Sequence, residues 1–168
     1  DECGRGPLAG PVIACSVGVS GENLDEYLYS FKSINVKDSK KLSAKKITSI
    51  ISQLGLPLKL PSNFRTIKRL HSNKFDKLDI VISANSHTYI DRNNILNASL
   101  DAMKKSFKLI SKHFIDEPKV LWLIDGPYSP LKRSIKNVND QSIIKGDSKS
   151  ILIALASVIA KYYRDKIM

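Results

Sequence analysis

Mostly apolar residues gather in several short stretches of the chain, as they do in strands that are buried on both faces. These runs predict strands at residues 12–19, 78–84, 119–124 and 142–145. Pro11 and Gly21 lie just outside the first run and punctuate its ends. The stretch at 56–77 has little periodicity, and we expect an extended excursion or a short hairpin there.

Elsewhere apolar residues recur every three or four positions, which is the spacing of one face of a helix. The predicted helices run from a cap at Ser43 to about Leu54, from a cap at Asp91 to about His113, and from Ser148 or Ser150 to the end of the sequence. Ala154, Ala156 and Ala160 give the last helix a smooth face that can pack closely on a sheet. Strands that alternate with helices predict an α/β domain, with helices flanking a mixed central sheet.

Composition narrows the class of protein. The 168 residues fit one domain with a continuous core. The sequence contains no run of about 18 apolar residues, so we expect no membrane span. Cys3 and Cys15 do not suggest a disulfide framework, which favours a reducing, cytoplasmic setting.

The net charge of +11 is concentrated in one part of the sequence. Residues 32–77 contain twelve Lys and Arg residues against two acids, so this segment carries +10. The other 122 residues hold fifteen basic and fourteen acidic residues and are nearly neutral. A basic surface beside a neutral body is typical of proteins that bind a polyanion, and nucleic acid is the polyanion we expect.

Carboxylates that lie beside glycines are the candidate ligands of a metal site. Asp1 and Glu2 run directly into a glycine-rich turn that contains Arg5, while Asp125 and Asp147 each lie next to a glycine at the end of a predicted strand. Carboxylate oxygens are the ligands of Mg²⁺ and Mn²⁺, and glycines let a main chain approach a phosphate-bearing substrate. Two such cations about 4 Å apart can align a water and stabilise the leaving oxygen in phosphodiester hydrolysis.

Each of these acids, taken alone, is better explained as a turn or cap residue, but three such positions in one basic protein favour a metal site. Neighbouring residues of a regular strand face opposite sides of the sheet. Asp1 and Glu2 can therefore serve one metal only if the strand ends or bulges there, and Gly4 and Gly6 permit such a break.

The motifs, taken together and in order, resemble type 2 ribonuclease H, also called ribonuclease HII. Residues 1–12 resemble the opening signature of that family, DEAGRGPLAGPV in its usual form, with Cys3 in place of the alanine. The other matching blocks are residues 38–43, 94–103, 123–126, 144–149 and 153–165. The resemblance covers nearly the whole chain.

The resemblance implies a ribonuclease H-like fold and a metal-dependent endonuclease. Such an enzyme hydrolyses the RNA strand of RNA/DNA hybrids and nicks duplex DNA 5′ of embedded ribonucleotides, leaving 5′-phosphate and 3′-hydroxyl ends. By this resemblance, Mn²⁺ or Mg²⁺ is the cofactor, RNA/DNA hybrid and ribonucleotide-containing duplex DNA are the partners, and the protein is a monomer.

The resemblance also implies roles for individual residues. The metal-binding and catalytic residues would be Asp1, Glu2, Asp125 and Asp147. The substrate-binding residues would be Gly4, Arg5 and Gly6 at the ribose 2′-hydroxyl, and Ser39, Lys40 and Lys41 near the phosphates. We read Asp165 as the ion-pair partner of Arg164 or of a neighbouring helix.

Several departures from the family pattern bear on these expectations. We expect residues 1–168 to form a single catalytic domain that lacks the family's first strand, upstream of Asp1, and a C-terminal segment whose glycine-tyrosine motif stacks under the ribonucleotide. Residues 56–77 are longer and more basic than the usual link and form a basic insertion.

Two other functions compete with this one. A dinucleotide-binding loop would also be rich in glycine, but Pro7 interrupts the turn and a strand follows where a helix should begin. A catalytically impaired module that binds RNA/DNA hybrid is the second alternative. Cleavage that requires Mg²⁺ or Mn²⁺ separates the enzyme from this module.

Overall fold

Two long antiparallel strands form the centre of the molecule. The computed structural model describes residues 1–6, 9–20, 24–37, 39–60, 66–115, 117, 119–131 and 138–168. Strands β2 (Val12–Val19) and β4 (Leu78–Asn85) pair over their whole length, from Val12 opposite Asn85 to Val19 opposite Leu78. The apolar runs predicted these two strands with nearly correct ends, because both are buried on both faces.

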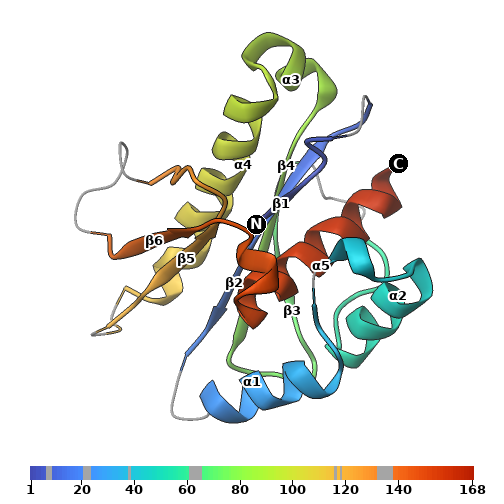
Figure 1. Cartoon of the computed structure of the whole chain (residues 1–168), viewed down its shortest axis with the longest axis vertical. Coiled ribbons are helices and arrows are strands. Elements are labelled where there is room, and N and C mark those ends of the chain that lie inside the picture. The colour runs from blue at the N-terminus through green and yellow to red at the C-terminus, as the bar shows by residue number, and fades with distance from the viewer. Residues whose placement is uncertain are drawn as a thin grey trace.

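Short strands complete the sheet on either side of this pair (Figure 1). Strand β1 (Glu2–Cys3) pairs with β2, and β3 (Ile67–His71) pairs with β4, both antiparallel, so the order is β1-β2-β4-β3. Strands β5 (Trp122–Asp125) and β6 (Asp140–Ile143) form a separate parallel pair. Beyond Cys15, the edge of β2 on the β1 side lines a cavity of about 640 Å³ that β5 borders from across.

Helices cover both faces of the sheet. Helices α3 (His87–Asn93) and α4 (Ile95–Ile110) lie on one side, while α1 (Leu24–Ser33), α2 (Ala44–Gln53) and α5 (Ile151–Ile167) lie on the other (Figure 1). The alternation along β2 explains the two layers: Ile13 and Cys15 pack with the α1, α2 and α5 side, and Ala14 packs with α4. Among the described helices, none combines the length and apolar character that crossing a bilayer requires.

Helix α5 is the most deeply buried of the described helices. From Ile153 to Ala160 every residue is buried, and Tyr162, Tyr163 and Arg164 continue the buried stretch. The predicted start at Ser150 is confirmed, since Ser150 is the N-cap and the turn η3 (Gly146–Ser148) precedes it. Burial raises the pKa of Tyr163, whose hydroxyl donates to the carbonyl of Pro57 at 2.6 Å.

The helix predicted from Asp91 is the clearest error of the sequence-based assignment. Asp91 lies inside α3, which begins one turn earlier because the Ser86 hydroxyl accepts a hydrogen bond from the amide of Tyr89. The chain then breaks at Asn94, whose φ of 60° is one that asparagine tolerates better than most residues. Asn94 also caps α4, since its side chain accepts from the amide of Asn97.

Other predicted strand boundaries differ from those of the structure, and one helix was not predicted. Strand β5 starts later than residue 119, and β6 starts earlier than residue 142 and ends before Lys145, which is left-handed. Helix α1 was not predicted from the sequence, because its only buried residues are Tyr27 and Phe31. In the segment 56–77, residues 67–71 form the edge strand β3, which pairs with β4 and not with a second strand of the segment; residues 61–65 lie outside the described part.

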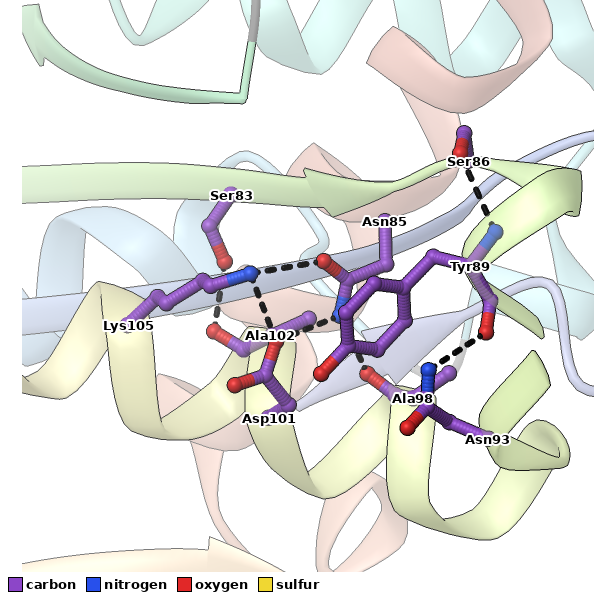
Figure 2. A network of polar contacts seen from close by, with 9 residues as sticks. All are labelled: Ser83, Asn85, Ser86, Tyr89, Asn93, Ala98, Asp101, Ala102 and Lys105. Atoms are coloured by element: carbon purple, nitrogen blue, oxygen red, sulfur yellow. Dashed lines mark hydrogen bonds and ion pairs between the residues drawn. The ribbon is translucent and has the colours of Figure 1, made fainter.

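A polar network fastens β4 to α4 (Figure 2). The side-chain amide of Asn85, which is 3% exposed, donates to the carbonyl of Ala98 and to Asp101, and its oxygen accepts from Lys105 at 2.9 Å. Lys105 also pairs with Asp101 at 2.6 Å and lies 5.0 Å from the centre of the Tyr89 ring. Burial alone would raise the pKa of Asp101, but the hydrogen bonds from Lys105 and Asn85 leave it below its ordinary value.

This network predicts an acid-sensitive contribution to stability. A carboxyl group whose pKa is lowered by folding stabilises the native state above its unfolded pKa of about 4, and the stabilisation is lost as the pH falls through the folded pKa. We expect Asp101→Asn to lower the free energy of unfolding at pH 7 by about 1 kcal/mol. The difference from the wild type should shrink below about pH 4 in urea titrations, and parallel curves for the two proteins down to pH 3 would contradict it.

Candidate active site

The amino-terminal carboxylates lie where β1 begins. The Asp1 amino group donates to the Cys15 carbonyl at 3.0 Å, and the Cys15 amide donates to the Asp1 carbonyl at 2.8 Å. One carboxylate oxygen of Asp1 accepts from the amide of Glu2 at 2.6 Å. Strand β1 ends at Cys3, and Gly4 follows with a φ of 113°. The ladder with β2 therefore runs through Asp1, Glu2 and Cys3, and the break lies beyond Cys3 and not between the two acids.

Asp125 and the turn that carries Asp147 come together at the end of β5. The amide of Gly146 donates to Asp125 Oδ1 at 2.6 Å. A side chain at position 146 would lie 2.9 Å from that oxygen and 2.6 Å from Ile153 Cδ1, so only glycine fits without displacement. Asp147 is the next residue, within η3, where the chain turns into α5. The strand-end positions predicted for both acids are thus close neighbours.

One of the four predicted acids, Asp1, borders the interior cavity. Asp1, Ile124 and Ile153 all line the 640 Å³ cavity between β2, β5 and α5, and Ile153 also lies beneath Gly146. In the residues that the structure describes, no three His, Cys, Asp or Glu side chains form a group that could hold a metal ion. The structure thus places Asp125 beside the turn that carries Asp147, and a joint metal site of these residues with Asp1 and Glu2 stays a prediction.

The glycine-rich turn is held by a residue that sequence reasoning assigned to another role. Arg164 of α5 is 7% exposed, and its guanidinium donates to the carbonyls of Pro11 at 3.2 Å and Ala9 at 3.0 Å. Arg5 is exposed and reaches Glu2 at 3.5 Å. Asp165 pairs with Lys161 of its own helix at 2.8 Å, so the expected pair with Arg164 or with another helix is wrong.

The basic turn beside α5 is anchored by a serine. In η1 (Ser39–Lys41), the Ser39 hydroxyl is 4% exposed and lies 2.8 Å from the hydroxyl of Ser157 on α5. This placement makes Ser39 an anchor for the turn, where the sequence suggested a residue near the phosphates. Lys40 and Lys41 are exposed, and Asp38 lies outside the described residues.

Neither cysteine is poised to act as a nucleophile. Burial raises the pKa of Cys3, although the nearby Arg164 guanidinium opposes the effect, and burial raises the pKa of Cys15 to about 12. Both thiols are therefore protonated near neutral pH and behave as small apolar side chains.

Comparisons with known proteins match this arrangement to one family. The family model described as Ribonuclease HII matches residues 1–168. The Ribonuclease HII of Fusobacterium nucleatum is 35% identical over 168 residues, which are 100% of this chain and 64% of the relative. That of Clostridioides difficile is 38% identical over 168 residues, 52% of its length. The chain therefore spans between about half and two thirds of these relatives.

Solved structures support the same fold. The ribonuclease H2 of Pyrococcus horikoshii OT3 has a TM-score of 0.65 and 18% identity, with 99% of this chain and 70% of that chain covered. The structure of a PCNA:RNase HII complex from Archaeoglobus fulgidus matches with a TM-score of 0.63 and 21% identity, and again 99% of this chain and 70% of that chain are covered. The mixed α/β architecture with flanking helices, expected from the sequence, is confirmed by these neighbours.

The anchoring of η1 to α5 can be measured by mutation. Ser157→Ala leaves the buried hydroxyl of Ser39 without this partner, and we expect the free energy of unfolding to fall by about 1–3 kcal/mol. Adding Ser39→Ala also removes the unpaired Ser39 hydroxyl. The double variant should therefore lose less unfolding free energy than the sum of the losses in the two single variants. Urea unfolding of the four proteins gives the coupling, and strict additivity would contradict a direct bond between the two hydroxyls.

Proposed function

Because the chain belongs to the ribonuclease HII family, we propose that it is an endonuclease that hydrolyses the RNA strand of RNA/DNA hybrids and nicks duplex DNA 5′ of embedded ribonucleotides. The observation that carries this proposal is the family match over all 168 residues. The chain spans 64% of the Fusobacterium nucleatum relative, so the activity of the whole protein is part of the proposal.

Mg²⁺ or Mn²⁺ is the cofactor that the donor chemistry fits. Asp1, Glu2, Asp125 and Asp147 offer only carboxylate oxygens, which suit hard divalent cations. When bound, such ions supply an activated water and stabilise the leaving 3′ oxygen, which would give 5′-phosphate and 3′-hydroxyl ends. The backbone amides of Glu2 and Gly146 each orient one carboxylate oxygen, of Asp1 and of Asp125.

The residues of the glycine-rich turn would distinguish ribonucleotides from deoxyribonucleotides. Gly4 and Gly6 carry no side chain, so the main chain of the turn can approach the ribose and test for a 2′-hydroxyl. Arg5 is exposed beside Glu2 and can reach a neighbouring phosphate. In this proposal the turn supplies recognition, and the carboxylates that flank it hold the reactive centre.

The basic segment would hold the duplex. Lys40 and Lys41 lie exposed on η1, and Lys45 and Lys46 follow on α2. These side chains give sequence-independent affinity through the phosphates. Helix α4, which covers the opposite face, lies outside residues 32–77, the segment that carries a net charge of +10.

Replacing the paired carboxylates tests the reactive centre. In Mg²⁺ or Mn²⁺, Asp125→Asn and Asp147→Asn should each lower the rate of cleavage by more than about 100-fold, since even groups that merely support metal ligands contribute 10- to 100-fold. A duplex with a single ribonucleotide, resolved on a sequencing gel, reports the rate, the cut position and the specificity. Hybrid binding should remain.

Asp165→Asn is the matched control, because Asp165 is an exposed carboxylate that pairs with Lys161. Its cleavage rate should stay near that of the wild type. Near-normal turnover in both test variants would remove Asp125 and Asp147 from the reactive centre. Binding without cleavage by the wild type at every metal concentration would instead favour the hybrid-binding module.

Salt dependence tests the basic face. Neutralising Lys40 and Lys41 together with glutamine should flatten the plot of log affinity against log salt, by up to about 0.9 per lost phosphate contact. Lys108→Gln with Lys112→Gln changes the charge equally on the α4 side and should leave the slope unchanged. Equal slopes for all three proteins would place the duplex elsewhere.

A further inference from the structure

Arg164 is a buried cation that faces backbone carbonyls. Its side chain leaves α5 near the helix's end, is 7% exposed, and donates from Nε to Pro11 O at 3.2 Å and from Nη2 to Ala9 O at 3.0 Å. The neighbouring carboxylate, Asp165, is occupied by Lys161. Burying a guanidinium is energetically costly. A buried arginine whose hydrogen bonds go to two backbone carbonyls of a loop therefore needs an explanation.

Both ends of the glycine-rich turn are shaped around this side chain. A Cβ at Gly4 would lie 2.8 Å from Arg164 Nε and 2.6 Å from Pro11 O, and Gly4 has a φ of 113°. A Cβ at Gly10 would lie 3.4 Å from Arg164 Nη2 and 2.1 Å from Met168 Sδ, and Gly10 has a φ of 91°. The guanidinium therefore lies between the start and the end of the turn, at places where only glycine allows so close an approach.

The turn has few other attachments among the described residues. Arg5 and Gly6 are exposed, and a Cβ at Gly6 would meet no atom within 4 Å. The β1 ladder ends at Cys3, and the β2 ladder begins at Val12. Between these ladders, Arg164 bonds the carbonyls of Ala9 and Pro11 at the end of the turn and packs against Gly4 at its start.

We propose that Arg164 is a positioning residue that holds the Gly4-Arg5-Gly6 turn in the conformation that distinguishes a ribonucleotide from a deoxyribonucleotide. Arginine suits the task because its planar fork can bridge two carbonyls at once, whereas a lysine ammonium presents a single point charge. The inference rests on the proposed function, since it assumes that this turn contacts the ribose. Arg164 itself stays beneath the turn and does not touch substrate.

Two measurements on Arg164→Gln and Arg164→Lys test the proposal. The first is the backbone NMR order parameter of Gly4 and Gly10, which should fall from the rigid range of about 0.85 to below about 0.6 in the glutamine variant, with the lysine variant in between. The second is the affinity in chelator for a duplex with one ribonucleotide relative to the same duplex of DNA alone. We expect this ratio to fall roughly 10- to 100-fold, with the affinity for the DNA duplex within about twofold of the wild type.

Lys166→Gln is the matched control, because it removes one positive charge from an exposed position on the same helix. It should change neither measurement. A folded Arg164 variant with a rigid turn, or with an unchanged affinity ratio while the wild type discriminates, would overturn the proposal. If the wild type binds both duplexes equally, the proposed function fails instead, and the order parameters still decide whether Arg164 holds the turn.

Discussion

The close packing of α5 against the sheet is the constraint on which the rest of the structure depends. Ala154, Ala156 and Ala160 are at most 4% exposed, and small side chains there let the helix approach β2 closely. Each segment of the site is fastened to this one helix: η3 leads into it, η1 bonds to Ser157, and the glycine-rich turn bonds to Arg164. Their relative positions are therefore set by one rigid element, although they are far apart in sequence.

The carboxylates of Asp1 and Asp125 are held in place by different elements. Asp1 is fixed through the β1–β2 ladder, and Asp125 is fixed as the last residue of β5. Each uses one oxygen to accept a backbone amide, so its orientation is set by main chain that is itself held in secondary structure. Such support requires no additional ordering of the chain, because the donating amides are already held in a ladder or a turn.

Sequence reasoning succeeded where the signal was local and uniform. The mostly apolar runs gave β2 and β4, and the serine cap gave the start of α2. It failed at Asn94, because only the conformation of the chain reveals that this residue both ends α3 and caps α4. A run of apolar residues could not predict α1 either, since that helix buries only two side chains in a mostly polar segment.

The site was predicted in part for the same reason. The glycines of the turn predicted that a phosphate-bearing substrate approaches its main chain, but the sequence could not show that Arg164 packs against Gly4 and Gly10. The neighbouring Asp165 suggested an ion pair, and the helix instead directs the two side chains to different partners. The burial of Ser39 was hidden likewise, because its partner Ser157 lies 118 positions away.

The identity of the cation beneath the glycine-rich turn has a geometric consequence. A guanidinium donates from a rigid plane, so the two carbonyls that it bonds must lie in fixed directions from the helix. These carbonyls belong to Ala9 and Pro11, which lead from the turn into β2. A rotation or a shift of α5 along its axis would therefore be transmitted directly to the main chain of the turn.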